Sequence, residues 1–161
     1  ALIDAVSDME GVAVFNLYEL SQEIAFNVDE WSKIISDASA VIYQFPFYWM
    51  SAPSLLKKWQ DEVFTFLSKT PAVAGKTLTV VTTTGSEYEA YRSGGRNRFT
   101  TDELLRPYQV SAIHSGMSWQ TPIVVYGMGT ADAGKNIAEG ANLYKQRVEM
   151  LIGSSNAGNN W

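Results

Sequence analysis

Residues 40–53 read Ala-Val-Ile-Tyr-Gln-Phe-Pro-Phe-Tyr-Trp-Met-Ser-Ala-Pro, and this stretch decides the fold. It begins as a continuous run of β-branched and aromatic residues, the composition of a strand that is buried on both faces. Pro46 ends the strand because proline has no N–H for the ladder. Ser51 can cap, and Pro53 can open, a helix over residues 55–67. The stretch therefore predicts a buried strand, an aromatic loop and a helix in direct succession.

The loop between this strand and helix carries large apolar side chains. In an open parallel sheet, ligands bind outside the carboxyl ends of the strands, which is where this loop would lie. Its bulky residues therefore predict a flat, apolar crevice suited to a planar ring: Phe47, Tyr48, Trp49 and Met50.

Strands and helices alternate along the rest of the chain. We expect the last turns of a helix at residues 1–9, strands at 12–17, 77–82 and 122–126, and helices at 28–37, 101–115 and 131–152. Such alternation predicts an α/β fold with a parallel sheet and helices on both faces. We expect one domain over residues 1–152 and a poorly ordered polar tail at 153–161.

Composition narrows the possible chemistry. The chain has 161 residues, 46% of them hydrophobic, a net charge of −5, no cysteine and one histidine. The sequence contains no stripe of basic residues that would indicate a nucleic-acid surface. No apolar run is long enough for a membrane span or a secretory signal, so we expect a cytoplasmic protein. Without cysteine there is no disulfide, thiolate zinc site or thiol nucleophile, and a lone histidine argues against a metal site. Catalysis would therefore depend on a cofactor.

A second signal follows the strand at 77–82. Residues 83–86 are Thr83, Thr84, Gly85 and Ser86. Threonine hydroxyls and consecutive N–H groups beside a glycine can bind the carbonyl and ring-nitrogen edge of a heterocycle. The alternative is a strand that simply stops at a glycine turn. Because this segment and the aromatic loop leave the same edge of one sheet, the ring-binding interpretation is favoured.

Residues 44–53 together with 55–59 resemble the flavodoxin-like NAD(P)H:quinone oxidoreductases. That family includes the modulator of drug activity B type and the ancillary subunits of glutathione-gated potassium efflux systems. Segments 81–85, 104–107, 116–119 and 144–147 agree with it. The resemblance implies a flavodoxin-like sheet of order 2-1-3-4-5, a bound FMN or FAD, NAD(P)H as hydride donor, and a quinone or similar acceptor. It also implies a homodimer with active sites at its interface.

The resemblance also implies roles for particular residues. The loop matching Pro46 to Met50 would pack on the flavin isoalloxazine, and the loop matching Thr83 to Ser86 would hydrogen-bond its edge. Tyr91 falls where a family tyrosine lies near the flavin carbonyl, which makes it the catalytic candidate. No residue is assigned to a metal.

Three features depart from the family. Its first strand and flavin-phosphate loop are missing from this sequence, so we expect the chain to lack roughly 25 to 30 residues, about one βα unit. Residues 66–76 are shorter than the family's loop over the active site. Some members pair the tyrosine with a histidine, whereas here Ile113 takes that place and His114 follows it. This argues against a Tyr–His proton relay, and His114 is read as a surface or packing residue.

Several other residues allow two interpretations. Arg92, Arg96 and Arg98 could attract the phosphates of a nicotinamide cofactor, or be ordinary loop charges. Trp31 and Trp59 are read as core or interface aromatics, and Asp61 and Glu62 as a solvated helix face.

Three functions follow from this sequence. The leading one is a flavoenzyme that takes a hydride from NAD(P)H and passes two electrons to a quinone. The second is a flavin-binding regulatory subunit in contact with a potassium efflux transporter in the membrane. The third is a one-electron flavodoxin carrier, which the modest charge of −5 favours less.

Overall fold

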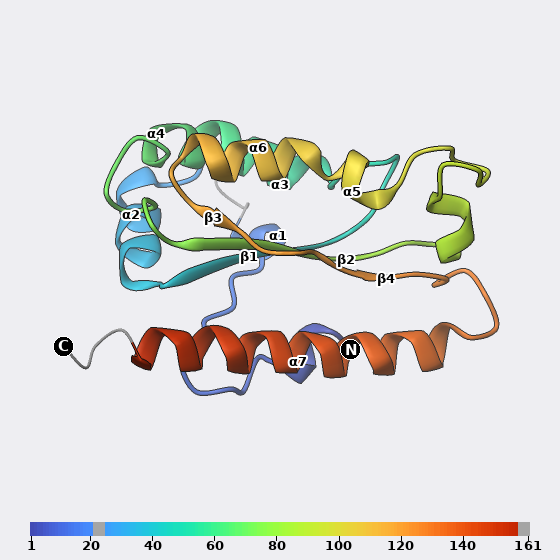
Figure 1. Cartoon of the computed structure of the whole chain (residues 1–161). Helices are drawn as coiled ribbons and strands as arrows, with labels where there is room; N and C mark the ends of the chain where they lie inside the picture. The colour runs from blue at the N-terminus through green and yellow to red at the C-terminus, as the bar shows by residue number, and fades with distance from the viewer. Residues whose placement is uncertain (21–24, 158–161) are drawn as a thin grey trace.

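Helices cover both faces of a parallel sheet in the computed structural model, which describes residues 1–20 and 25–157 (Figure 1). The elements in chain order are a 3₁₀ turn Ile3–Ala5, α1 Leu17–Leu20, α2 Val28–Asp37, β1 Ala40–Pro46, α3 Ser54–Trp59, a π-helical turn Gln60–Phe64, α4 Thr65–Leu67, β2 Thr77–Thr83, a 3₁₀ turn Tyr88–Tyr91, α5 Thr101–Leu104, α6 Arg106–His114, β3 Ser118–Trp119, β4 Ile123–Val125 and α7 Ala133–Ala157.

The sheet is built around β2. It pairs in parallel with β1 along its whole length, from Ala40 opposite Thr77 to Pro46 opposite Thr83. On its other side β2 pairs with β3 at its start and with β4 at its end. The predicted flavodoxin-like, open parallel sheet is confirmed. The strand order 2-1-3-4-5 stays a prediction, because β1 has β2 as its one strand neighbour within residues 1–20 and 25–157.

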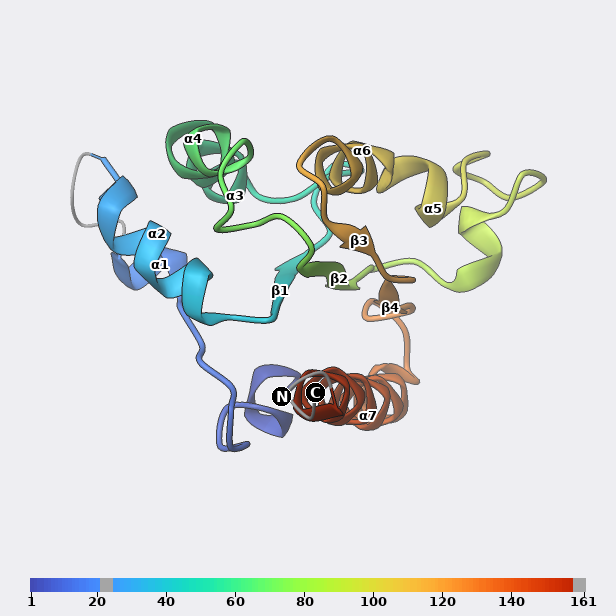
Figure 2. The same cartoon turned by 60° about the vertical axis from the view of Figure 1, so that its left-hand side comes forward.

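Two hydrophobic cores lie on opposite faces of the sheet. On one face, α3 to α6 cover the sheet, and on the other lies α7 together with the N-terminal segment (Figures 1 and 2). Adjacent residues of β2 belong to different cores, Val80 to the first and Val81 to the second. This confirms the strand at 77–82 as one buried on both faces. Gly140 brings α7 close to β4, since a Cβ at this position would lie 2.3 Å from Val125 Cγ2.

The N-terminal predictions were wrong in two places. Residues 12–16 form no strand, because Asn16 starts a helix instead: its side chain accepts a hydrogen bond from the Tyr18 N–H at 3.1 Å, and its carbonyl accepts from the Glu19 N–H. Asparagine side chains favour such local bonds over a ladder. Residues 1–9 form a 3₁₀ turn and further turns rather than a helix, with Leu2 and Val6 buried against α7.

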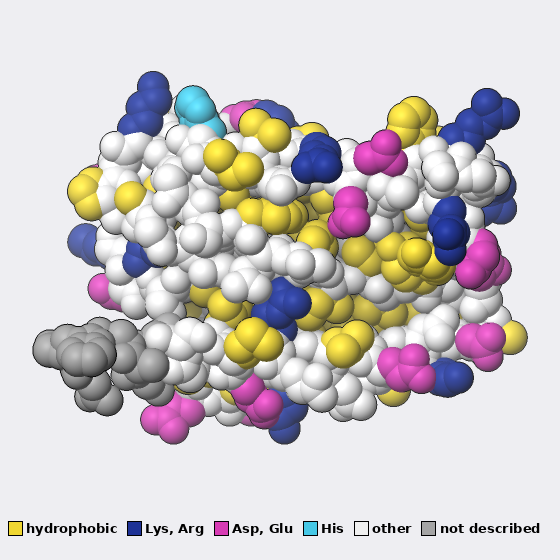
Figure 3. All heavy atoms as spheres, viewed as in Figure 1, with side chains coloured by type: hydrophobic (Ala, Val, Ile, Leu, Met, Phe, Trp, Pro, Cys, Tyr) yellow, Lys and Arg dark blue, Asp and Glu magenta, His cyan; other side chains and the backbone are white. Residues whose placement is uncertain are grey.

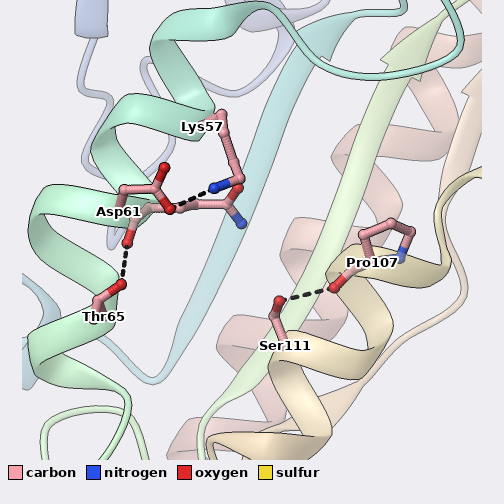
Figure 4. A network of polar contacts seen from close by, with 6 residues as sticks. Lys57, Asp61, Thr65, Pro107 and Ser111 are labelled. Atoms are coloured by element: carbon pink, nitrogen blue, oxygen red, sulfur yellow. Dashed lines mark hydrogen bonds and ion pairs between the residues drawn. The ribbon is translucent and has the colours of Figure 1, made fainter.

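The helix predicted at 55–67 exists, with corrections. It begins at Ser54 and contains the π-helical turn, in which the Thr65 hydroxyl donates to the Gln60 carbonyl at 3.2 Å. Ser51 does not cap it; Pro53 occupies the N-cap position without a side-chain bond. Asp61 pairs with Lys57 on the exposed face, as expected of a solvated surface (Figure 4). Glu62 was wrongly assigned to that face: it pairs with Lys58 but is half-buried, and its carboxylate accepts a hydrogen bond from the Phe26 N–H at 3.2 Å.

Two further boundaries differ from prediction. The helix expected at 101–115 is divided into α5 and α6 at Leu105, because Pro107 at the start of α6 has no N–H to continue the α5 bonds; the Ser111 hydroxyl donates to the Pro107 carbonyl (Figure 4). The last helix runs to Ala157 and not to the predicted end at 152, so residues 153–157 belong to α7, and residues 158–161 of the predicted tail lie outside the described part. No helix in the described part is both long and apolar enough to span a membrane.

Two buried tyrosines predict a loss of stability in alkali. Burial raises the pKa of Tyr144 to about 12 and also raises the pKa of Tyr43. Since the folded-state pKa lies above the unfolded value of about 10, the neutral phenols stabilise the fold below pH 10, and this contribution is lost as the pH rises toward 12. We expect the free energy of unfolding to fall by up to about 1.4 kcal/mol per pH unit for each tyrosine. Urea unfolding between pH 8 and 11 measures this free energy. In Tyr144→Phe it should fall with a smaller slope as the pH rises, and Tyr18→Phe, at an exposed position, is the control. An equal slope in Tyr144→Phe would contradict the assignment.

Candidate functional site

Three strands end at one edge of the sheet. β1, β2 and β4 finish at Pro46, Thr83 and Val125. Backbone bonds continue past these ends: the Phe47 N–H donates to the Thr83 carbonyl at 2.9 Å, and the Thr84 N–H donates to the Val125 carbonyl at 2.9 Å. The loops that follow the three strands therefore start side by side. This edge is where an open parallel sheet binds its ligand.

The aromatic loop forms a tight turn at this edge. The Tyr48 N–H donates to the Ser51 carbonyl at 2.8 Å, and the Ser51 N–H donates to the Tyr48 carbonyl at 2.9 Å. Tyr48 is 60% exposed, Trp49 97% and Met50 42%. Exposed large apolar side chains in sequence mark a surface for a ligand or partner. The turn thus presents aromatic faces to solvent, and the apolar crevice stays a prediction.

Phe47 lies deeper and joins a tyrosine cluster. Its ring is half-buried and meets Tyr91 edge to face, with centroids 6.1 Å apart. Tyr91 is 6% exposed and lies 5.9 Å from the ring of Tyr126, which lies 5.3 Å from that of Tyr88. Tyr91 therefore stands beside the aromatic loop, although its ring is largely covered by its neighbours.

Hydrogen bonds that its backbone carbonyl groups accept hold the segment 83–86 in place. The Met128, Gly129 and Gly127 N–H groups donate to the carbonyls of Thr84, Gly85 and Ser86, each at 2.9 Å. The buried Thr84 hydroxyl donates to the Ser86 carbonyl at 2.8 Å, so it is not available to a ligand. Within the described residues, no acceptor takes the Gly85 or Ser86 N–H, and the half-buried Thr83 hydroxyl has no partner. The segment thus offers donors on a rigid frame.

The arginines of the next loop turn back toward this segment. Arg96 donates from Nη2 to the Ser86 hydroxyl, and the Arg92 guanidinium lies over the Tyr88 ring, 5.4 Å from its centroid. Arg98 is exposed. Arg96 therefore reaches the predicted site.

Sequence reasoning missed two tyrosines at this edge. The Tyr126 hydroxyl lies 2.6 Å from the Thr101 hydroxyl, and burial raises the pKa of Tyr126. Tyr126 helps line a cavity of about 370 Å³ between the end of β4 and the start of α7. In Figure 3 hydrophobic side chains gather along the band between α7 and the helices on the other face. The position of Tyr126 directly after the buried strand β4 could have identified this residue from the sequence. The second missed residue, Tyr108 of α6, contacts the aromatic turn.

The single histidine lies elsewhere. His114 is exposed at the end of α6, and the following Gly116 carbonyl accepts a bond from the Gly75 N–H just before β2 begins. His114 is therefore at the amino edge of the sheet, opposite Tyr91, which agrees with its reading as a surface residue.

Trp31 and Trp59 are 8% and 3% exposed, which confirms both as core residues. Within the described residues, no group of three or more His, Asp or Glu side chains is placed to hold a metal ion.

Curated relatives match most of this chain. It is 35% identical over 154 residues to general stress protein 14 of Bacillus subtilis, covering 93% of this chain and 87% of that protein. It is 34% identical to the B. subtilis protein named uncharacterized NAD(P)H oxidoreductase YdeQ, covering 92% and 77%. It is also 34% identical to the glutathione-regulated potassium-efflux system ancillary protein KefG of Serratia proteamaculans, covering 78% and 70%.

Solved structures match equally widely. General stress protein 14 of Treponema denticola in complex with FMN superposes with a TM-score of 0.82 at 27% identity, covering 93% of this chain and 88% of that one. An NADPH-quinone reductase from P. pentosaceus gives a TM-score of 0.76 at 27% identity, covering 91% and 85%. A thermophilic tryptophan halogenase from Streptomycin violaceusniger gives 0.84 at 35%, covering 91% and 87%. Its name assigns it an activity that the names of the five other proteins above do not mention.

The same relationship holds at the level of the family. Residues 1–148 match the family described as having a flavodoxin-like fold. This range includes every strand, the aromatic turn and the segment 83–86. The chain belongs to the flavodoxin-like fold family.

Proposed function

We propose that this chain is a flavin-dependent oxidoreductase that takes a hydride from NAD(P)H and reduces a quinone or a similar acceptor. One observation carries the proposal: an exposed aromatic turn and a rigid row of free hydrogen-bond donors leave neighbouring strands at the same edge of the sheet. The names of two relatives, an NAD(P)H oxidoreductase and an NADPH-quinone reductase, support the same class of reaction.

The residues present fit a flavin ring. An isoalloxazine has an apolar face and an edge of carbonyl oxygens and ring nitrogens that accept hydrogen bonds. Tyr48 and Trp49 supply exposed aromatic surface, and the N–H groups of Gly85 and Ser86 supply donors. Donors fixed in advance bind an acceptor edge without a reorganisation cost. FMN is proposed because the T. denticola relative contains it. The proposal assigns no residue to the ribityl phosphate.

The chain's own residues have limited tasks in this reaction. A bound flavin supplies the hydride chemistry, and a protein places and shields such a cofactor. The aromatic turn would cover the ring and exclude water from one face. The donors of residues 85–86 would hold the ring edge, and Tyr91 would lie beside it at the 6.1 Å contact with Phe47. No protein base or nucleophile is needed.

Flavin titration and steady-state turnover of the full-length protein test the proposal. We expect FMN to bind at the micromolar level or below, and NADPH or NADH to be oxidised only when FMN and a soluble benzoquinone are both present. Stopped-flow reduction of the bound flavin by NAD(P)H separates this activity from a one-electron carrier. A protein that binds no flavin, or whose flavin NAD(P)H does not reduce, would contradict it.

A second candidate is supported by the KefG similarity: a flavin-binding regulatory subunit of a potassium efflux transporter. Under it, FMN binds but quinone turnover stays negligible, and the protein co-purifies with such a transporter from membranes.

The homodimer stays a prediction, which light scattering of the full-length protein checks. The phosphate-binding role of Arg92, Arg96 and Arg98 also stays a prediction.

A further inference from the structure

The aromatic turn has a backbone conformation that its residues do not favour. Trp49 has φ +45° and Met50 has φ +63°, with the mutual hydrogen bonds of Tyr48 and Ser51 closing the turn. Two central residues with positive φ define a type I′ turn, for which Asn-Gly is the preferred sequence. A Cβ atom is strained in this left-handed region, and large side chains rarely adopt it. Something outside the central residues must therefore hold the turn.

The side chains of the turn do not hold it. Trp49 is 97% exposed, and Tyr48 and Met50 are 60% and 42% exposed. With so little packing at its tip, the strained conformation can be held only from its base. Strain of this kind persists where the surrounding structure imposes it, typically at functional sites.

Tyr108 holds the base of the turn. Its hydroxyl accepts a hydrogen bond from the Ala52 N–H at 3.2 Å and lies 3.3 Å from the Ser51 hydroxyl. These contacts join α6 to Ala52 and Ser51, which precede Tyr108 by 56 and 57 positions in the chain. They occur on the two residues that follow the strained pair, so they fix the point at which the chain leaves the turn.

Tyr108 is itself immobilised by packing. It is 6% exposed, and its ring lies 5.4 Å from that of Phe45 and 6.3 Å from that of Tyr43. Both partners belong to β1, the strand that leads into the turn. The hydroxyl therefore has a fixed position relative to the sheet edge, and it transmits that position to the turn.

We propose that Tyr108 is a positioning residue for ring binding, whose hydroxyl keeps the strained Tyr48–Ser51 turn in the conformation that presents Trp49. The role rests on the proposed function, because it assigns the turn to the flavin ring. A turn that is already ordered in the free protein loses little conformational entropy when the ligand binds, so binding is tighter. Without the hydroxyl, the turn relaxes toward conformations with negative φ, and the ring must reorder it.

Tyr108→Phe removes the hydroxyl and keeps the packed ring. We expect FMN to bind about tenfold more weakly, the scale of one net hydrogen bond. In the protein without flavin, we expect the Ser51 amide, whose own partner Tyr48 is untouched by the change, to exchange its hydrogen faster. Tyr144→Phe, a buried tyrosine of α7 on the other face of the sheet, is the matched control and should change neither quantity.

Relief of strain provides a second readout. Met50→Gly removes the penalty of positive φ, so Tyr108→Phe should weaken FMN binding less in a Met50→Gly background than in the wild type. A purely structural role of Tyr108 would give equal losses in both backgrounds. If Tyr108→Phe fails to fold, Ser51→Ala, at an exposed position, removes one of the two contacts, and the Tyr48 amide, which donates to the carbonyl of residue 51, is then the exchange probe beside the FMN titration.

The outcomes separate this inference from the proposed function. Unchanged exchange at Ser51 in the flavin-free variant overturns the positioning role, whether or not FMN binds. Faster exchange with unaltered FMN affinity overturns its part in ring binding. If the wild-type protein binds no FMN, the proposed function fails, and the exchange experiment still decides whether Tyr108 holds the turn.

Discussion

Trp59→Ala should lower the free energy of unfolding by about 3–5 kcal/mol, the range for truncating a buried tryptophan. The side chain is 3% exposed, and its ring lies 5.1 Å from that of Trp31 and 5.9 Å from that of Tyr43. Removing it leaves a cavity between α2, α3 and β1 that these rigid aromatic neighbours cannot fill. Urea unfolding of the flavin-free protein measures the loss.

Phe66→Ala is the control for Trp59→Ala. Phe66 lies on α4, the continuation of the same helical run, but its side chain is 63% exposed. Its truncation should change the free energy of unfolding by no more than about 0.5 kcal/mol, as surface substitutions usually do. Similar losses in the two variants, or a loss below about 1.5 kcal/mol for Trp59→Ala, would show that the aromatic cluster does not support the core.

The strands could be predicted from the sequence where local chemistry and burial agree. β1 and β2 contain continuous apolar and β-branched residues, and Pro46 stops the first of them. The helix at 28–37 was found with its Asn27 cap, whose side chain accepts from the Asp29 and Glu30 N–H groups. In each case, the signal lies within the element itself.

The errors arose where a residue has a partner far away or a competing local bond. Ser51 has the composition of a helix cap, yet its hydroxyl meets Tyr108, 57 residues later. Residues 12–17 have the composition of a strand, yet Asn16 starts a helix there. β3 has two residues and pairs with the start of β2, and a strand this short has no periodicity that could reveal it. Such contacts exist only once the chain is folded.

The candidate site shows the same division. The aromatic loop and the segment 83–86 follow from strand ends that the sequence marks clearly, and the structure places both at one edge of the sheet. The sequence could not show that the Thr84 hydroxyl is used internally, because its acceptor is the Ser86 carbonyl in a folded loop. It could not show the strain at residues 49 and 50 either, since nothing in the residue types predicts positive φ there.

Trp49→Ala should weaken FMN binding by about 1–3 kcal/mol, roughly 5- to 150-fold in Kd, the scale of stacking between an aromatic side chain and a base. The same change should leave the melting temperature of the flavin-free protein close to that of the wild type, because Trp49 is 97% exposed and leaves no cavity. A Trp49 side chain packed in the core beneath the following helix would instead give a large loss of stability, as expected at Trp59. Flavin titration and thermal melting together distinguish the two roles.

Trp49→Phe is the matched variant for this test, since it keeps an aromatic face on the same strained backbone. It should retain most of the affinity that Trp49→Ala loses, and turnover with NAD(P)H and a quinone should follow the affinity in both variants at limiting FMN. Because alanine and phenylalanine share the penalty of positive φ, a difference between them reports the ring and not the strain. Equal FMN affinity in all three proteins would show that the turn presents Trp49 to something other than a flavin ring.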